Sequence, residues 1–567
     1  MFLYTYENLK RITQTENGKK VIEGVKQAYE KLYKDVPTVA NSYSYFKLIY
    51  KNGNRDLYQK LYYDRRKRLS YLQLLALADD SYLEELEDII NVILEEYTWV
   101  LPAHCYESGD SFDYTVIDLF SAETGFYLAE TAYVLKDKLS SDIKVRIKTE
   151  LKRRIIDNYE KRGQLWYDIE NNWAAVCAGS VGITYLYAFP ERFAAVKDRI
   201  FATMECYLKG TREEGVTPEG VGYWIYGFGF FTLFFDMYEQ FTGDYPEILK
   251  KKKVINTLQY INNARLSGNC YLPYADGGQR KTQIHAPIAY AVKRLFGDSF
   301  TLPAYEVDGE FASRLTENTG KVIGFRVLYG MDTFGFGDKK TDQAKSVYYS
   351  ESQIFIHKNK DYSFTAKCGT NAEMHNHNDV GSFQIVVNGK GVIVDPGPAK
   401  YTWQYFNDMK VRYSEETFAA GSMGHSVPIV NGKYQKTGEF ACGTVLEATK
   451  KNFKFDFAPA YEGIDSLIVN YQMENKAVKI AYACKGVEES VTFRFLSFDE
   501  PTLLADGSVS VDGITVKCAS GLTPNLKKIE YLGHINLMSM KNYETIYALD
   551  YTVVGQKDLE AEFEFVI

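Results

Sequence analysis

The chain has 567 residues, more than a single hydrophobic core normally supports, so two or more domains are expected. Hydrophobic residues make up 46% of the sequence and charged residues 25%, the proportions of an ordinary water-soluble globular protein. The formal net charge of −8 argues against nucleic acid as the main partner, because nucleic-acid binding requires a basic face. The charge also disfavours broad electrostatic capture of a long polyanion, although a local basic cleft can still form.

Three sequence features favour a cytoplasmic location. The first ten residues, MFLYTYENLK, lack the basic region and apolar run of a signal peptide, unless such a peptide has been removed. The eight cysteines are scattered with no Cys-x-x-Cys pair, which indicates reduced thiols in a reducing compartment. The uncharged stretch 220–235 is shorter than the roughly 20 residues that a bilayer requires. We therefore expect a cytoplasmic protein that does not contact membranes.

The first half of the chain is predicted to be helical. Between residues 83 and 97, apolar residues recur every three or four positions with acidic residues between them, the pattern of an amphipathic helix. Similar patterns occur at 18–35, 118–136, 141–160, 173–188, 191–210, 221–241 and 245–263. Helices of similar length joined by short Gly, Pro and Asn segments are compatible with a helical toroid or solenoid built from hairpins.

The pattern changes after about residue 305. Short β-branched and aromatic runs then alternate with turns, at 322–329, 347–357, 383–387, 391–395, 478–484, 490–496 and 545–554. The segment Asn388–Gly391 is predicted to join two of these runs as a hairpin turn. Many short strands at this spacing predict an antiparallel β-sandwich. The boundary lies within 300–320, and we divide the chain into a helical domain, 1–310, and a β-sandwich domain, 311–567.

Histidines are concentrated in one short segment of the predicted β region. His375 and His377, two of only seven histidines in the chain, lie in the stretch Glu373–Phe383. Asp395 and His425 follow in the sequence. Two histidines with a carboxylate form a ligand set that suits a divalent transition metal such as zinc.

A shared metal site requires a particular course of the chain. In a straight hairpin, Asp395 would lie roughly 23 Å from His377. Residues 376–381 must therefore fold back as a loop if both side chains bind one ion, and their Asn, Asp and Gly residues permit this. The alternative is that His375 and His377 are exposed on a strand and that Asp395 only begins a turn.

Two polar segments of the helical region are candidates for a binding cleft. Asn172 and Trp173 precede a helix of small residues, Ala174–Gly182, although most Asn residues before a helix only cap it. The loop Tyr274–Arg280 offers Arg280 to an anionic substrate, and its alternative role is that of a solvated turn. Neither segment is specific by itself.

A third candidate lies at the start of the apolar helix near residue 223. Glu219, Tyr223 and Tyr226 occur there at close spacing. The chain contains 46 tyrosines, so any one of them has a packing role more often than a catalytic role.

Taken together, these motifs resemble those of heparinase II/III-type polysaccharide lyases. The resemblance covers roughly residues 95–440, and the stretch His375–Phe383 is its most specific part. The motifs that occur in the family's order are Trp99–His104, Asp118–Thr124, Asn-Asn-Trp173, Glu-Gly-x-x-Tyr223, His375–Phe383, Asp-Pro-Gly397 and Gly-His425.

The resemblance implies a fold, a reaction and a cofactor. The fold is an incomplete (α/α) toroid followed by an antiparallel β-sandwich, with the active site between them. The reaction is β-elimination at a uronic-acid sugar of a polysaccharide or oligosaccharide, which gives an unsaturated uronate product. The cofactor is a zinc ion with a chiefly structural role, and His377, Asp395 and His425 match the family's metal ligands.

The resemblance also assigns roles at the active site. Asn172, Tyr223 and His375 match the family's catalytic positions. Some members have a histidine where this chain has Trp173, so a histidine base from the helical domain is not expected here. The residues expected to contact the substrate are Trp173, Glu219, Tyr226 and Arg280.

The chemistry of β-elimination explains these residue types. The C5 proton of a uronate becomes acidic enough to remove only when donors neutralise the adjacent carboxylate, a role that suits Asn172 and His375. A base then takes the C5 proton, and an acid protonates the leaving oxygen at C4. Tyr223 can serve as either, provided that a neighbouring positive charge lowers its pKa from about 10. With a cytoplasmic location, we expect the substrate to be imported oligosaccharides.

Three other functions are compatible with the sequence. A helical toroid can carry a glycoside hydrolase, for which Glu219 and Asp276 are the available carboxylates. The His-x-His motif with Asp395 and His425 also suits non-haem iron. The third is a non-catalytic glycan-binding protein. Only a lyase generates the near-ultraviolet chromophore of an unsaturated uronate, which separates it from the other three.

Overall fold

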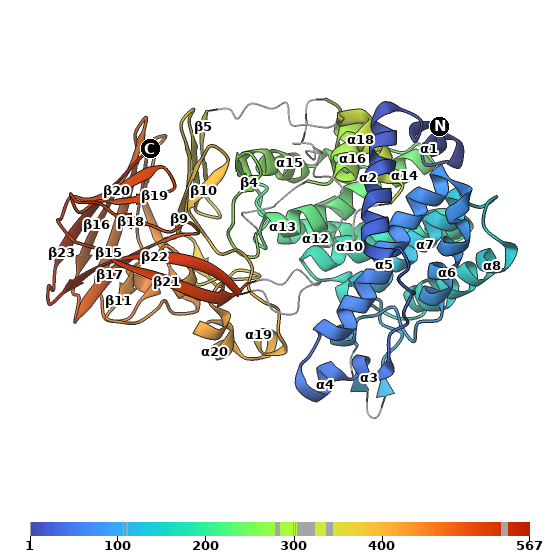
Figure 1. Ribbon diagram of the computed structural model, residues 1–567, viewed down its shortest axis with the longest axis horizontal. Helices are drawn as coiled ribbons and strands as arrows, with labels where there is room; N and C mark the ends of the chain where they lie inside the picture. The colour runs from blue at the N-terminus through green and yellow to red at the C-terminus, as the bar shows by residue number, and fades with distance from the viewer. Residues whose placement is uncertain are drawn as a thin grey trace.

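The computed structural model consists of a helical part and a β-sheet part that lie side by side (Figure 1). The structure describes residues 2–105, 107–108, 111–277, 284–298, 300, 302, 324–335, 344–533 and 543–567. The N-terminus lies on the helical part and the C-terminus on the β part (Figure 1). The expected fold class, an incomplete (α/α) toroid followed by an antiparallel β-sandwich, is confirmed.

The helical part contains long helices joined by short turns. Its α-helices are α1 (Tyr6–Ile12), α2 (Glu16–Tyr33), α3 (Tyr43–Phe46), α4 (Leu48–Asn52), α5 (Asp56–Ala78), α6 (Leu83–Leu94), α7 (Leu119–Val134), α8 (Ser141–Leu151), α9 (Asp157–Lys161), α10 (Asn172–Ala188), α11 (Pro190–Phe193), α12 (Lys197–Gly210), α13 (Val221–Tyr223), α14 (Gly229–Thr242), α15 (Lys252–Ala264), α16 (Ala286–Phe296) and α18 (Arg326–Phe334).

Helix α10 is at the centre of this part and is buried along almost its whole length. It packs against α7, α12 and α14. Its small residues allow α14 to approach closely, since a Cβ on Gly182 would lie 2.4 Å from the ring of Phe234. A Cβ on Gly179 would likewise lie 2.9 Å from the carbonyl oxygen of Phe230. The small-residue pattern of α10 therefore serves helix packing and positions its first residue, Asn172.

The sequence patterns did not predict α5, the longest helix described. Its charged segment 64–68 suggests solvent exposure, but Arg65 and Arg66 are buried. Both guanidinium groups donate to the buried carboxylate of Glu96, with Arg65 Nε 2.6 Å from Oε1 and Arg66 Nη2 2.7 Å from Oε2. A single tertiary partner thus makes burial of two cations possible, which helical periodicity alone does not reveal.

The strand predicted at 322–329 is wrong. Helix α18 begins at Arg326 and packs against α2 and α16, as part of the helical core. Short apolar runs do not distinguish a buried helix from a buried strand, and Gly330 permits the close contact with Ala286 that fixes the helix. The domain boundary predicted between residues 310 and 311 lies outside the described residues and stays a prediction.

Within the described residues, the β part contains three larger antiparallel sheets. Their strand orders are β10-β9-β7-β6-β5, β11-β17-β22-β21 and β13-β14-β15-β16-β23-β20-β19-β18. The strands are β5 (Lys345–Tyr349), β6 (Ile354–Lys358), β7 (Ser363–Lys367), β9 (Phe383–Val387), β10 (Lys390–Ile393), β11 (Ile429–Val430), β13 (Thr444–Ala448), β14 (Asn452–Asp456), β15 (Ser466–Met473), β16 (Ala477–Lys485), β17 (Ser490–Ser497), β18 (Thr502–Leu503), β19 (Val509–Val511), β20 (Ile514–Cys518), β21 (Asn525–Leu532), β22 (Tyr543–Val554) and β23 (Leu559–Val566).

Two predictions from the sequence concern the sheet that contains β5–β10. The hairpin predicted at Asn388–Gly391 is confirmed: Asn388 (φ 50°) and Gly389 (φ 77°) form the two-residue turn between β9 and β10. The run predicted at 347–357 is two strands, β5 and β6, joined by a turn in which Gln353 has φ 52°.

The five-stranded sheet is buried on both faces and joins the two parts. Alternate residues of β6 point in opposite directions, as the pleat requires. Ile354 and Ile356 belong to the core of the helical part, whereas Phe355 belongs to the core between the sheets. The sheet therefore orients the β part against the toroid. The loop that contains His375 leads into its strand β9, and Asp395 follows its strand β10.

In the part of the chain that the structure describes, no helix is both long enough and apolar enough to cross a membrane. None of the eight cysteines, all of which the structure describes, forms a disulfide bond, in agreement with the predicted reduced thiols.

Candidate active site

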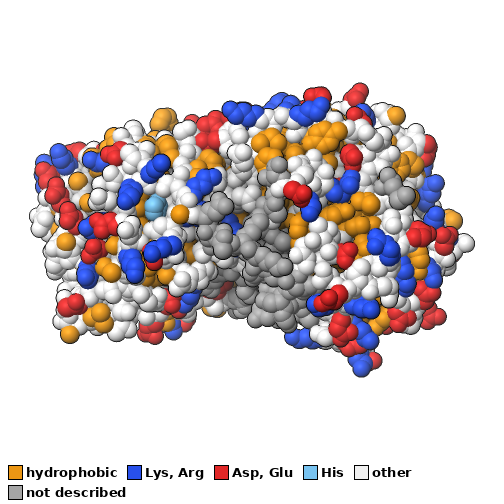
Figure 2. Space-filling model, turned by 90° about the horizontal axis from the view of Figure 1, so that it is seen from above, with side chains coloured by type: hydrophobic (Ala, Val, Ile, Leu, Met, Phe, Trp, Pro, Cys, Tyr) orange, Lys and Arg blue, Asp and Glu red, His pale blue; other side chains and the backbone are white. Residues whose placement is uncertain are grey.

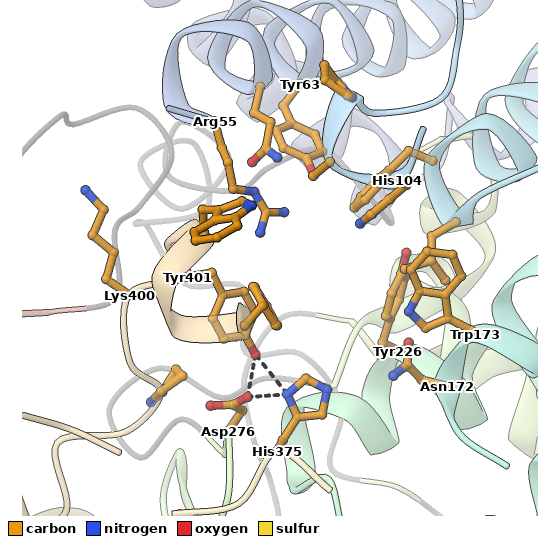
Figure 3. Close-up of a pocket in the computed structure, with 18 of the residues that line it drawn as sticks. Arg55, Tyr63, His104, Asn172, Trp173, Tyr226, Asp276, His375, Lys400 and Tyr401 are labelled. Atoms are coloured by element: carbon orange, nitrogen blue, oxygen red, sulfur yellow. Dashed lines mark hydrogen bonds and ion pairs between the residues drawn. The ribbon is translucent and has the colours of Figure 1, made fainter. Parts of the chain in front are cut away.

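A cavity of about 1250 Å³ lies where the helical and β parts meet. Figure 3 shows its side chains converging from several segments that are distant in the sequence. Its lining includes Arg55, Tyr63, His104, Asn172, Trp173, Tyr223, Tyr226, Asp276 and His285 from the helical part, and His375, Lys400, Tyr401, Trp403 and Phe406 from the β part. The position between domains is typical of a ligand site.

Asn172 reaches the site because its neighbour caps the helix. Asn171 is the N-cap of α10, and its side-chain oxygen accepts from the backbone N–H of Trp173 (2.9 Å). The capping role considered for Asn172 is therefore filled by Asn171. Asn172 instead donates to Glu219, through its backbone N–H (3.0 Å) and its Nδ2 (2.6 Å).

Glu219 is fixed just before the short helix that contains Tyr223. The next residue, Gly220, has φ +98°, and a Cβ there would lie 2.7 Å from the carbonyl oxygen of Tyr274. Only glycine suits this combination of positive φ and close backbone approach. The Glu-Gly motif thus directs the chain so that Tyr223 lines the cavity.

His375 lies on a loop that folds back between β8 (Thr370–Asn371) and β9. The backbone N–H of Glu373 donates to the side-chain oxygen of Asn376 (3.2 Å), and His375 itself has φ 53°. The buried Lys367 forms ion pairs with Glu373 (2.9 Å) and Asp379 (2.8 Å), which hold both ends of the loop. The fold-back required by the metal-site hypothesis is therefore present.

The His375 ring contacts four functional groups. Its Nδ1 lies 2.5 Å from Oδ2 of Asp276, and its Nε2 lies 3.5 Å from Oε1 of Glu219. Its face stacks on Tyr223, with ring centroids 4.2 Å apart. Nδ1 also lies 3.2 Å from the hydroxyl of Tyr401.

Asp276 and Tyr401 complete this cluster, as the dashed lines in Figure 3 show. The hydroxyl of Tyr401 donates to Oδ2 of Asp276 and lies 2.9 Å from the hydroxyl of Tyr223. The sequence identified Asp276 only as a possible hydrolase carboxylate, and it did not identify Tyr401 at all. The sequence feature that could have pointed to Tyr401 is its position, four residues after the Asp-Pro-Gly397 motif.

Burial and charge set the protonation of these groups. Burial raises the pKa of Tyr223 well above 10, and the nearby carboxylate of Asp276 adds to the effect. The lowered pKa that a base role for Tyr223 requires is therefore not found in the ligand-free protein. Burial opposes protonation of His375, but its bond to Asp276 and the charges of Asp276 and Glu219 outweigh burial and raise the pKa of His375.

The three predicted metal ligands converge inside the β part. Each of His377, Asp395 and His425 offers a buried ligand atom, and these atoms lie within 4.8 Å of one another. Nδ1 of His425 is 2.8 Å from Oδ2 of Asp395, and Nε2 of His377 is 3.3 Å from Oδ1 of Asp276. The opposite nitrogens, Nδ1 of His377 and Nε2 of His425, are buried without a hydrogen-bond partner among the described residues.

Unpaired buried nitrogens cost free energy unless something binds them. Two imidazole nitrogens and a carboxylate are the donor set of a zinc site. The residues present therefore fit a divalent metal ion, with Asp276 orienting one ligand from the helical part.

The other residues predicted to contact the substrate, so far as the structure describes them, do not belong to the cluster around His375. Trp173 and Tyr226 line the cavity, and the Tyr226 hydroxyl donates to the buried carboxylate of Glu123, away from His375. Arg280 lies outside the described residues. His104, which ends the Trp99–His104 motif but was assigned no role from the sequence, also lines the cavity, and its Nδ1 lies 2.8 Å from Asp118.

Comparisons with known proteins agree with this architecture. Residues 341–463 match the family described as Heparinase II/III-like, C-terminal. Similar solved structures include a heparinase III, with 12% identity, a TM-score of 0.63 and coverage of 98% of this chain and 85% of that chain. They include the heparan sulfate lyase of Pedobacter heparinus, with 11% identity, a TM-score of 0.56 and coverage of 96% and 83%.

A third similar structure is the chondroitin AC lyase of Streptomyces coelicolor A3 in complex with chondroitin sulphate. Its identity is 10%, its TM-score 0.56 and its coverage 99% of this chain and 82% of that chain. No curated protein sequence matches the chain. At such low identities the likeness establishes the fold, and the function must be argued from the site.

Proposed function

We propose that this protein is a polysaccharide lyase, a carbon–oxygen lyase, because residues 341–463 match the Heparinase II/III-like C-terminal family. It cleaves uronic-acid-containing polysaccharides or oligosaccharides by β-elimination and releases an unsaturated uronate. The observation that supports this most directly is the cluster of Asn172, Tyr223 and His375 on one cavity between the domains.

His375 and Asn172 neutralise the uronate carboxylate in this mechanism. The raised pKa of His375 favours its cationic form, and its side chain remains partly accessible from the cavity. Asn172 supplies a neutral donor that Glu219 orients through two hydrogen bonds. Both interactions strengthen as charge moves from C5 onto the carboxylate, which lowers the barrier to removal of the C5 proton.

Tyr223 transfers the protons. With its raised pKa the phenol is neutral in the ligand-free protein, so it begins as a donor suited to the leaving oxygen at C4. Removal of the C5 proton by Tyr223 requires the phenol to lose its own proton first. The hydrogen bond between the hydroxyls of Tyr223 and Tyr401 is the contact through which that proton can leave the phenol.

We further propose that His377, Asp395 and His425 hold one zinc ion. Such an ion acts structurally, since it joins the loop before β9, the end of β10 and the segment before β11. It thereby supports the loop from which His375 projects into the cavity. Trp173, Glu219, Tyr226 and Arg280 remain the proposed contacts for the sugar chain.

A glycoside hydrolase is the second candidate, because two carboxylates flank His375. Glu219 lies on its Nε2 side and Asp276 on its Nδ1 side. However, Glu219 accepts two hydrogen bonds from Asn172, and Asp276 accepts from Tyr401 and both histidines. Because these bonds engage both carboxylates within the protein, proton transfer to a sugar suits Tyr223 better.

The test is a panel of uronic-acid polymers and their oligosaccharides, including heparan sulfate, chondroitin, hyaluronan and alginate. A lyase produces the near-ultraviolet absorbance of an unsaturated uronate from at least one of them. New reducing ends without that absorbance would establish a hydrolase instead. Binding without either product would indicate a glycan-binding protein.

A further inference from the structure

Arg55 is a cation in the cavity that the proposed reaction does not use. It lies at the N-terminal end of α5, as the N-cap residue, and its side chain extends toward the centre of the cavity (Figure 3). It is close enough to Tyr401 and Tyr223 for their hydroxyl groups to raise the pKa of its guanidinium. Arg55 therefore faces the reacting region from the side opposite Asn172 (Figure 3).

No carboxylate of the described residues forms an ion pair with Arg55. The adjacent acid, Asp56, pairs with Lys400 of the β part at 3.3 Å. The partners of the Arg55 guanidinium are neutral: the Gln59 amide oxygen accepts from it at 3.1 and 3.2 Å in the orientation that satisfies both groups. The ring of Phe406 lies 5.5 Å away.

These contacts orient Arg55 without neutralising it. Burial lowers the pKa of Arg55, because a guanidinium there loses hydration, and the adjacent Asp56 carboxylate opposes this shift only in part. An arginine remains protonated at neutral pH even so. The result is a positioned positive charge on the cavity lining that no carboxylate of the described residues binds directly.

The position of Arg55 depends on both parts of the molecule. The turn before it contains Gly53, with φ +74°, where a Cβ would lie 3.1 Å from Cβ of Trp403 on α19 (Trp403–Asn407). Together with the Asp56–Lys400 ion pair, this contact fixes the start of α5 against the β part. Arg55 is thereby held over the cavity and not left to sample solvent.

The overall charge of the chain does not favour capture of an anion. The face in Figure 2 carries acidic and basic side chains interspersed over both parts, and the net charge of the chain is −8. Recognition of an anionic sugar therefore depends on cations within the cavity. Arginine suits this task, since its planar fork binds carboxylate or sulfate through two parallel hydrogen bonds.

We propose that Arg55 binds an anionic group, a carboxylate or a sulfate, on the sugar next to the one whose C5 proton is removed. This group differs from the carboxylate that Asn172 and His375 neutralise, because Arg55 lies across the cavity from Asn172. Arg55 would thus select chains with an acidic group on the neighbouring sugar. The inference rests on the proposed lyase function.

The experiment uses the Tyr223→Phe protein, which is expected to bind oligosaccharides without cleaving them. Its Kd is measured by calorimetry for uronate oligosaccharides with and without sulfate, and again after adding Arg55→Gln. We expect affinity to fall about 30-fold, the lower end for removing one member of a buried charge pair. Arg55→Lys should restore part of it, because it restores charge without the fork.

Lys60→Gln is the matched control, since Lys60 lies on the same helix, outside the cavity lining. It makes the same change in net charge and should leave Kd unchanged. Thermal melting of each variant identifies any that fail to fold. If Arg55→Gln loses affinity for both sulfated and unsulfated ligands, the group that Arg55 binds is a carboxylate. If it loses affinity for sulfated ligands alone, that group is a sulfate.

Equal affinity of Arg55→Gln and its parent for every ligand would overturn the inference. The proposed function is tested separately, with the protein that retains Tyr223. If that protein forms no unsaturated product from any oligosaccharide, the lyase assignment fails. If product forms but Arg55→Gln binds normally, only the role of Arg55 fails.

Discussion

Two histidines only two residues apart lie in different environments. The side chain of His375 is 19% exposed and reaches the cavity, whereas that of His377 is fully buried inside the β part. Both contact the same carboxylate, with His375 at Oδ2 of Asp276 and His377 at Oδ1. One residue from the helical part thus connects the proposed catalytic cluster, which is accessible from the cavity, with the buried cluster of proposed metal ligands.

The difference shows how access determines the role of a histidine. His375 is surrounded by proton donors and acceptors that a substrate can reach, which suits it to interact with developing charge. His377 instead presents an unpartnered nitrogen to Asp395 and His425 in a closed space, which suits a structural ion. Substitutions in the cluster around His375 should therefore change turnover, whereas substitutions around His377 should change metal binding and thermal stability.

The largest expected effect is on turnover, from Tyr223→Phe. This change removes the hydroxyl that contacts Tyr401 and keeps the ring stacked on His375. Initial rates of chromophore formation should fall at least about 10²-fold, with circular dichroism and metal content unchanged. Tyr226→Phe is the control, because its hydroxyl bonds to Glu123; if that variant is inactive and Tyr223→Phe is active, the wrong tyrosine has been assigned.

Asn172→Ala should lower turnover by about 10²-fold, the usual scale for losing a donor to charge that grows in the transition state. The substitution leaves the capping residue Asn171 in place, so α10 should remain intact. Steady-state kinetics should show a loss mainly in kcat, not KM. A change confined to KM would indicate that Asn172 only binds the ground state.

On the other side of the comparison, His425→Ala should remove the metal ion. Zinc measured in protein purified without added metal should be near one per chain in the parent. The variant should bind zinc at least about 100-fold more weakly, since even neighbours of metal ligands typically contribute 10- to 100-fold.

The melting temperature of His425→Ala should also fall, because the ion joins segments distant in the sequence. Activity should decrease as a consequence of the displaced loop. A folded and active parent protein without bound metal would contradict the metal assignment.

The smallest expected effects come from Asp276→Asn, which alters both clusters at once. The amide keeps the shape of the side chain but removes the negative charge that contacts His375 and His377. We expect about 10-fold losses in turnover and in zinc affinity, as for other residues that orient a ligand or a catalytic group. If only one property changes, the two clusters are not coupled through this carboxylate.

The sequence alone determined the broad architecture. Helical periodicity predicted elements that correspond to α2, α6, α7 and α10, and the Asn388–Gly391 turn fixed the β9–β10 hairpin. These features are local, since side-chain spacing and positive φ depend on neighbouring residues. The family motifs also predicted Asn172, Tyr223 and His375 as site residues, and all three line the cavity.

Only the tertiary structure decided which side chains meet. Asp276 and Tyr401 are 125 residues apart, yet they bond to each other and complete the cluster around His375. Helix α18 and the buried cations of α5 likewise depend on partners elsewhere in the chain. Periodicity carries no information about such long-range contacts, because they arise from how the toroid and the five-stranded sheet pack together. The distinct environments of His375 and His377 have the same origin.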